Sequence, residues 1–233
     1  MVCGDHRDDR TFHHVDYGKS PSPRGDISLD WVEAISLGPA FYLVGSIPTA
    51  YILVYLTKGV DIRQVGTGNV GALNAFHQTG VVGGLVVLAI DAGKGALAVL
   101  AIDWAGVPDW TLYLSAPLLM AGHNWPVLLG FRGGKGAASI FGISLAVQPI
   151  PTLITLVPVV LLVIMIRNVV WSAAFGFVLL NIMLVATRQG AEQIALCAGL
   201  TVIVTLTYMF SIREQIGESI KTRQWRELFT NLA

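Results

Sequence analysis

Charged residues are scarce in this sequence: they make up 13% of its 233 residues, whereas an ordinary soluble domain has about 25%. Positive charge is not in excess either, because 15 basic and 15 acidic residues cancel. The chain therefore lacks the basic surface with which proteins bind nucleic acid. Hydrophobic residues make up 54% of the chain and the mean hydropathy is +0.64. This composition predicts an all-α integral membrane protein with several spans.

Cysteine is scarce as well. The two cysteines, Cys3 and Cys197, cannot build a disulfide framework, and neither lies in a CxxC or another metal-ligand spacing. We therefore expect no metal centre, no structural zinc and no thiol redox chemistry.

Long uncharged runs set the expected number of spans. They cover 34–57, 81–102, 110–131, 136–166, 168–187 and 193–212. The run 136–166 has 31 residues and as one helix would extend about 46 Å, well beyond a hydrocarbon core of about 30 Å. Pro149 and Pro151 predict a break in it, with a short helix before the break and a full span after it. The total is then seven transmembrane helices.

Loop charges predict the orientation of these spans. With seven spans, nine basic residues lie on the side of the membrane that holds the C-terminus: Lys58, Arg63, Arg132, Lys135, Arg167, Arg213, Lys221, Arg223 and Arg226. The loops on the opposite side hold only Arg188. With six spans the loops would balance. Adding Lys19 and Arg24 reduces the bias without reversing it. The positive-inside rule therefore places the N-terminus outside and the C-terminus in the cytoplasm.

The two ends of the chain are polar. We expect 1–33 to be a flexible N-terminal tail, because it has many charges and few large apolar residues, and it is a candidate contact for a protein partner. The membrane domain is expected over 34–212. Residues 213–233 are expected to form a cytoplasmic amphipathic tail.

The first of two glycine-rich loops spans 61–74. Its glycines match the dinucleotide-binding pattern GxGxxG, but that pattern needs a βαβ unit, and membrane spans flank this loop. Glycine amides can still approach an anion closely. The groups that would do so are the amides of Gly66, Gly68 and Gly71, with Thr67, Asn69 and Asn74 as side-chain donors. The alternative is a tight re-entrant turn in which the glycines only permit packing.

The second glycine-rich loop, 130–136, places Arg132 and Lys135 among Gly130, Gly133, Gly134 and Gly136. It is not a Walker A loop, since Leu stands at position 129 and Gly at position 136. Two cations among glycines at a membrane surface suit a phosphate. Alternatively, both cations are positive-inside anchors. Because both loops lie on the same side, we favour one shared anion site.

Three polar residues lie within or at the ends of predicted spans. Asp91 and Lys94 are three residues apart, hence on one helix face, and leaving either unpaired would be costly, so they form either a structural pair or part of a site. His123 is a candidate base or phosphate donor. Its alternative role is that of a helix-end histidine bonded to a backbone carbonyl.

Several of these residues belong to an ordered series of motifs. The series is Gly45-Ser46-Ile47-Pro48, Asp61-Ile62-Arg63, Gly66-Thr67-Gly68-Asn69, Asp91 with Lys94-Gly95, Gly122-His123-Asn124 with Pro126, and Gly133-Gly134-Lys135-Gly136. From about 34 to 212 the chain resembles the bacterial acyl-phosphate:glycerol-3-phosphate acyltransferases of the PlsY type. The resemblance implies a seven-span inner-membrane enzyme of phospholipid synthesis. Such an enzyme transfers a fatty acyl group from acyl phosphate to glycerol 3-phosphate and forms lysophosphatidate.

The resemblance also implies roles for individual residues. Thr67, Lys135 and His123 would be catalytic, and Asp91 and Lys94 would be a supporting charge pair. The phosphates of acyl phosphate and glycerol 3-phosphate would contact Gly66, Gly68, Asn69, Asn74, His77, Gly133, Gly134 and Gly136. The acyl tail would lie among apolar helices, in contact with membrane lipids. No metal or coenzyme is implied.

The sequence departs from the family pattern at several of its polar positions. Thr67, Leu73 and His77 stand where the family has serine, threonine and arginine. Val170 and Ala173 replace serines, with Ser172 adjacent, and the segment 211–216 lacks the family's histidine and asparagine. Two interpretations follow: an active acyltransferase, or a catalytically impaired homologue that is a lipid-binding or structural subunit of a larger membrane complex. A transporter ranks third, because no internal repeat pairs the broken helices.

Overall fold

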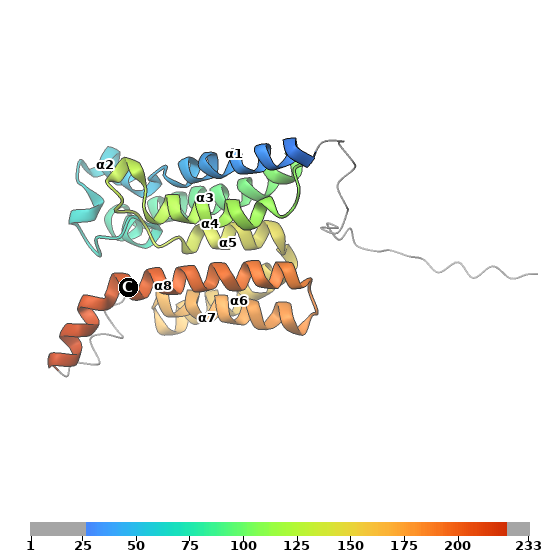
Figure 1. Cartoon of the computed structure of the whole chain (residues 1–233). Coiled ribbons are helices and arrows are strands. Elements are labelled where there is room, and N and C mark those ends of the chain that lie inside the picture. The colour runs from blue at the N-terminus through green and yellow to red at the C-terminus, as the bar shows by residue number, and fades with distance from the viewer. Residues whose placement is uncertain (1–26, 223–233) are drawn as a thin grey trace, which may run out of the picture.

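A computed structural model describes residues 27–222, and all regular structure within that range is helical (Figure 1). The elements are α1 (Ile27–Gly45), α2 (Thr49–Lys58), η1 (Ile62–Gln64), α3 (Ala72–Ala105), α4 (Thr111–Asn124), η2 (Val127–Leu129), α5 (Ala137–Val147), α6 (Pro149–Ile166), α7 (Val169–Ala186) and α8 (Ala191–Thr222). Thus α1 begins inside the segment expected as a tail, and α8 continues beyond the expected end of the membrane domain. Residues 1–26 and 223–233, which include most of the predicted tails, lie outside the described residues.

Within residues 27–222, five candidate spans satisfy the length and hydropathy of a membrane helix. They are 35–58, α3, α6, α7 and the part of α8 up to Ser211. The remaining helices, α4 with 14 residues and α5 with 11, are shorter. In Figure 1, α1, α3, α4, α5, α6, α7 and α8 run back and forth along one axis. The protein is therefore a multi-pass helical membrane protein, and the count of seven crossings stays a prediction.

The break predicted within the longest uncharged run is confirmed. α5 ends at Val147 and α6 begins at Pro149, because proline lacks an amide proton and cannot continue the preceding helix. Gln148, between the two helices, has extended φ and is 6% exposed. The short α5 and the longer α6 thus form an antiparallel pair, with Gln148 buried at their junction and Ile150 exposed.

Three predicted span boundaries differ from the structure. The first run, 34–57, is divided between α1 and α2 at Ser46–Pro48. The second span begins at Ala72 rather than at residue 81, and α3 passes through Gly80, whose φ of 80° and ψ of −171° are non-helical; such angles favour glycine. The third does not reach residue 131, since α4 ends at Asn124, just before Pro126.

Close helix contacts in the core depend on glycine. On the α3–α5 contact, a Cβ on Gly95 would lie 2.1 Å from the Ser139 carbonyl oxygen, and one on Gly142 would lie 1.8 Å from that of Ala92. On the α1–α4 contact, a Cβ on Gly45 or on Gly122 would likewise lie 2.1 Å from a backbone carbonyl oxygen of the facing helix. Small residues let membrane helices approach until their backbones touch. In each of these two pairs the helices are therefore closely packed.

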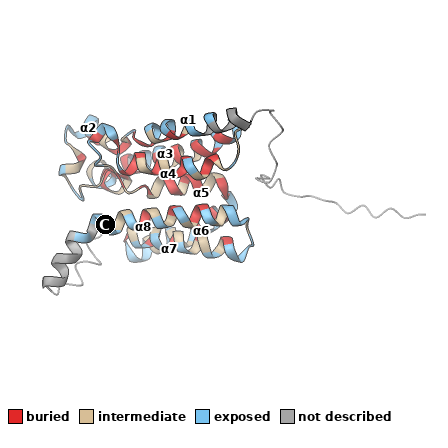
Figure 2. Ribbon diagram, viewed as in Figure 1, coloured by how far each residue is buried: buried red, intermediate tan, exposed pale blue. Residues whose placement is uncertain are grey.

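The helices form two layers, which Figure 1 shows one above the other: α1 to α5, and α6 to α8. Contacts of α5 with α6 and α8, and of α4 with α8, join them. Buried residues concentrate where helices face one another, and exposed ones lie on the outer faces (Figure 2). Many of those exposed residues are large and apolar, for example Val82, Leu97, Val160 and Ile182, as expected for surfaces in contact with lipid.

Candidate active site

The first glycine-rich loop is organised by Asn74, at the start of α3. Its side chain is fully buried and donates to the backbone oxygens of Ile62, Val65 and Asn69, at 3.1, 3.0 and 3.0 Å. Its Oδ1 accepts from the Thr67 amide at 3.3 Å. Asn74 therefore positions the turn that carries Thr67 and Asn69, and its own amide group is used within the loop.

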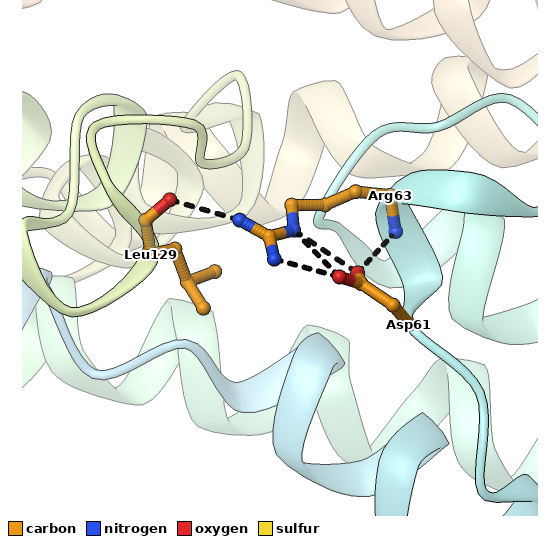
Figure 3. Close-up of polar contacts among 3 residues, drawn as sticks. All are labelled: Asp61, Arg63 and Leu129. Carbon is orange, nitrogen blue, oxygen red and sulfur yellow. Dashed lines mark hydrogen bonds and ion pairs between the residues drawn. The ribbon is translucent and has the colours of Figure 1, made fainter.

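The ion pair of Asp61 and Arg63 in the first loop connects it to Leu129, the residue directly before the second loop (Figure 3). The Asp61 carboxylate accepts from the Arg63 backbone amide at 2.9 Å and from the guanidinium, whose Nη2 lies 2.6 Å from Oδ2. The side-chain hydrogen bond from Arg63 lowers the pKa of Asp61. Arg63 Nη1 also donates to the Leu129 carbonyl oxygen at 2.9 Å, so the pair fixes the distance between the two glycine-rich loops.

The second loop lies against the C-terminal end of α4. The amides of Gly133 and Gly134 donate to the carbonyl oxygens of Asn124 and His123, at 3.1 and 3.0 Å. A Cβ on Gly134 would lie 2.2 Å from His123 Nε2, so the imidazole packs directly on the loop backbone. These glycines thus allow a close contact, and their two amides are occupied by it. Gly136, with φ of 78°, turns the chain into α5.

Lys135 extends from this loop towards α8. Its Nζ lies 4.2 Å from the centre of the Tyr208 ring, a cation–π contact. Burial lowers the pKa of Lys135, because a low-dielectric environment disfavours the ammonium ion. Among the described residues, no carboxylate forms an ion pair with Lys135. The ammonium group is therefore poised to bind an anion. Arg132, three residues earlier, is exposed.

The predicted pair of Asp91 and Lys94 is confirmed. Lys94 Nζ lies 2.8 Å from Asp91 Oδ1, and the two side chains are 6% and 2% exposed. The same ammonium donates to the Ile47 carbonyl oxygen at 2.6 Å. That carbonyl lies in the break between α1 and α2, where Pro48 interrupts the helix. The pair therefore stabilises an opened backbone inside the protein.

A cavity of about 260 Å³ joins these groups to the second layer. Its polar end is lined by Asn69, Asp91, His123, Lys135 and Gly136, together with Ala137 and Ala138 at the start of α5. Beyond this end it runs between α5, α6 and α7 along apolar side chains that include Phe141, Leu156, Val159, Phe177 and Leu180. A charged end and an apolar body suit an amphiphile with an anionic head group.

The cavity includes some of the predicted site residues and not others. Thr67 and His77 are exposed and do not line it, and neither do Gly66, Gly68, Gly133, Gly134 or the buried Asn74. At the positions that depart from the family, Leu73, Val170 and Ala173 line the cavity with apolar groups. The adjacent Ser172 is buried and donates to the Asn168 carbonyl oxygen.

Tyr208 and Thr207 were not predicted as site residues. Thr207 Oγ1 accepts from Asn124 Nδ2 at 3.1 Å, and Tyr208 packs on Lys135. Both lie on α8, more than 70 residues from the second loop in sequence. No motif connects such distant positions, so only the packing of α8 against α4 and α5 reveals them. The described residues contain no group of His, Cys, Asp or Glu able to hold a metal ion.

Fold and cavity together define a class: a multi-pass helical membrane protein whose internal cavity has a charged end and an apolar body. The family model described as "Glycerol-3-phosphate acyltransferase" matches residues 35–221. The chain therefore belongs to the glycerol-3-phosphate acyltransferase family, and the resemblance carried by its motifs is confirmed.

Curated relatives of this family align over different lengths. A glycerol-3-phosphate acyltransferase of Desulforamulus reducens is 35% identical over 185 residues, 79% of this chain and 90% of the relative. Glycerol-3-phosphate acyltransferase 4 of Dehalococcoides mccartyi is 47% identical over 118 residues, 51% of each chain. In that second alignment the chain spans about half the length of its relative.

Solved structures share the fold. The crystal structure of PlsY (YgiH), an integral membrane glycerol 3-phosphate acyltransferase, in its glycerol 3-phosphate form superposes with a TM-score of 0.71 at 28% identity. The match covers 82% of this chain and 94% of that one. A lysophosphatidic acid form gives a TM-score of 0.69 at 27% identity.

Proposed function

We propose that this protein transfers a fatty acyl group from acyl phosphate to glycerol 3-phosphate and releases lysophosphatidate and inorganic phosphate. The observation that carries the proposal is the cavity. It joins a lysine that has no carboxylate partner among the described residues to an apolar groove between helices. The cavity thus matches a substrate with a phosphate at one end and an alkyl chain at the other. Crystal forms of the related PlsY with glycerol 3-phosphate and lysophosphatidic acid support it.

The phosphate is bound at the start of α5. Ala137 and Ala138 line the cavity, and no side chain in the described part of the chain caps this helix. The first backbone amides of a helix have no internal partner and attract anions. Lys135 adds a charge-assisted hydrogen bond. Because the amides of Gly133 and Gly134 are occupied, the contribution of these glycines is the close packing of the loop on His123.

The reaction needs positioning and charge stabilisation more than covalent catalysis. The hydroxyl oxygen of glycerol 3-phosphate attacks the acyl carbon, the bond from that carbon to the phosphate oxygen breaks, and the departing phosphate takes up the hydroxyl proton. Asn69 and His123 lie at the polar end of the cavity, where they donate hydrogen bonds to the acceptor or to the developing oxyanion.

The site faces the cytoplasm in this proposal. Both glycine-rich loops lie at one end of the bundle, and the basic residues Lys58, Arg63, Arg132 and Lys135 lie at that end too. The positive-inside rule then places this end in the cytoplasm of a bacterial inner membrane. An N-terminal tail outside the membrane remains a candidate contact for a protein partner, and it lies outside the described residues.

Purified protein in lipid nanodiscs tests the proposal. Supplied with acyl phosphate and glycerol 3-phosphate, it should form lysophosphatidate and inorganic phosphate in equal amounts. Acyl-CoA or acyl carrier protein as donor, or omission of either substrate, should give no product. Absence of product at every pH, with recovery of the protein in a stoichiometric complex after mild extraction, would instead favour an impaired structural subunit.

A further inference from the structure

Two consecutive residues of α8 contact the second glycine-rich loop, one directly and one through Asn124. Thr207 Oγ1 accepts from Asn124 Nδ2 at 3.1 Å, and the Asn124 carbonyl oxygen accepts from the Gly133 amide at 3.1 Å. The next residue of the helix, Tyr208, has the centre of its ring 4.2 Å from Lys135 Nζ. The position of Lys135 therefore depends on α8 as well as on its own loop.

The N–H groups of Lys135 are not used within the described part of the chain. No hydrogen bond and no ion pair engages its ammonium group there, and the contact that it makes is the one with the face of the Tyr208 ring. Both side chains line the cavity. The ammonium group can therefore keep its contact with the ring and donate hydrogen bonds to an anion in the cavity.

Other ionisable groups do not take the place of the ring. Besides Lys135 and Tyr208, the cavity is lined by Asp91 on α3 and His123 on α4. Asp91 forms its ion pair with Lys94 at 2.8 Å, and within residues 27–222 neither cavity residue pairs with Lys135. Two arginines, on the second loop and on α8, are exposed: Arg132 and Arg213.

The ring offsets part of the cost of burying the lysine. Burial disfavours the charged form of Lys135 and lowers its pKa. The face of an aromatic ring attracts a cation, and the attraction is stronger where water is excluded. It belongs to the ring and not to the hydroxyl group of Tyr208, so phenylalanine at this position would supply it and leucine would not.

We propose that Tyr208 is a positioning residue for acyl transfer, whose ring holds the Lys135 ammonium group at the polar end of the cavity, where the substrate phosphate binds. The ring contacts the ammonium group through its face and leaves the N–H donors of the lysine to the phosphate. The inference rests on the proposed acyl transfer and adds α8 to the elements that build its site.

The pH dependence of kcat/KM in nanodiscs tests the proposal, because it reports ionisations of the free enzyme. In the wild type, kcat/KM should fall with rising pH as Lys135 loses its proton. Tyr208→Leu removes the ring and destabilises the ammonium form, so the fall should move to lower pH by about one unit, as expected for a cation–π contact away from water. Tyr208→Phe should keep the fall at the wild-type pH, which also excludes the Tyr208 phenol as its origin.

Phe210→Leu is the matched control, because Phe210 is an aromatic residue of α8 that is 66% exposed and does not line the cavity. It should keep both the rate and the pH profile of the wild type. If Tyr208→Leu lowers kcat/KM equally at every pH, the ring only packs and the proposal is wrong. An equal shift in Tyr208→Phe and Tyr208→Leu would also overturn it, since the hydroxyl group would then be responsible.

A measurement without turnover separates this inference from the proposed reaction. NMR of the protein with isotope-labelled methyl groups on its lysines reports the pKa of Lys135, whose signal is identified by its absence in Lys135→Arg. This pKa should be lower by about one unit in Tyr208→Leu and unchanged in Tyr208→Phe. If no acyl phosphate reacts but this difference is present, the proposed reaction fails and the hold of the ring on Lys135 stands. If acyl phosphates react and Tyr208→Leu changes neither the pKa nor the pH profile, the role of Tyr208 fails alone.

Discussion

Replacement of Lys94 by methionine tests how the buried pair supports the fold. The substitution keeps a similar side-chain length but removes the ammonium group that bonds Asp91 Oδ1 at 2.8 Å and the Ile47 carbonyl oxygen at 2.6 Å. A carboxylate that is 2% exposed is then left without its partner. Breaking a buried pair by removing one member costs about 3–5 kcal/mol, so Lys94→Met should lower the free energy of unfolding by about that amount.

Thermal and denaturant unfolding of the detergent-solubilised protein measures this loss. Lys58→Met is the matched control, since Lys58 is exposed at the end of α2, and it should change stability little. The double variant Asp91→Leu/Lys94→Met should recover part of the loss, because it leaves no unpaired charge. Wild-type stability in Lys94→Met, or a double variant less stable than Lys94→Met, would refute the structural role of the pair.

Three further predictions concern packing, protonation and topology. Gly142→Ala should destabilise the protein strongly in unfolding assays, because its Cβ would lie 1.8 Å from a carbonyl oxygen, whereas Gly93→Ala, which meets nothing within 4 Å, should be neutral. Burial lowers the pKa of Lys135, so lysophosphatidate formation should fall as pH rises, beginning below the usual lysine pKa, and Lys135→Arg should move the fall to higher pH. A pH profile unchanged by that variant would exclude Lys135 as its origin. With Cys3 replaced by serine, a cysteine at Arg188 should react with an impermeant thiol reagent from outside intact cells, and one at Arg132 only after permeabilisation. The reverse labelling would contradict the orientation.

Helix breaks illustrate how far the sequence predicts the fold. The break at Gln148 is predictable because an uncharged run of 31 residues is too long for one span and two prolines flank its middle. The division of the first run at Pro48 is not predictable in this way, because a single proline can merely kink a membrane helix. Here the backbone opened at Pro48 is stabilised by Lys94, distant in sequence, which donates to the Ile47 carbonyl oxygen.

Prediction of the site from the sequence is limited in the same way, by contacts between residues that are distant in the chain. The i,i+3 spacing identifies Asp91 and Lys94 as a pair, and the motif series identifies the loops that carry Asn69 and Lys135. Which way a loop side chain points depends on contacts that the motif does not contain. Asn74 uses its amide within the loop, and Thr67 is exposed. Long-range partners such as Tyr208 have no sequence signal at all.

The most direct test of the account compares Lys135→Ala with Arg132→Ala in the lysophosphatidate assay. Lys135 lies at the polar end of the cavity, while Arg132 is exposed three residues away on the same loop. Loss of one charge-assisted hydrogen bond to the substrate phosphate should lower kcat/KM by about ten-fold or more in Lys135→Ala. Arg132→Ala should remain close to the wild type. An equal loss in both variants, or none in Lys135→Ala, would contradict the claim that the cavity binds the substrate phosphate through Lys135.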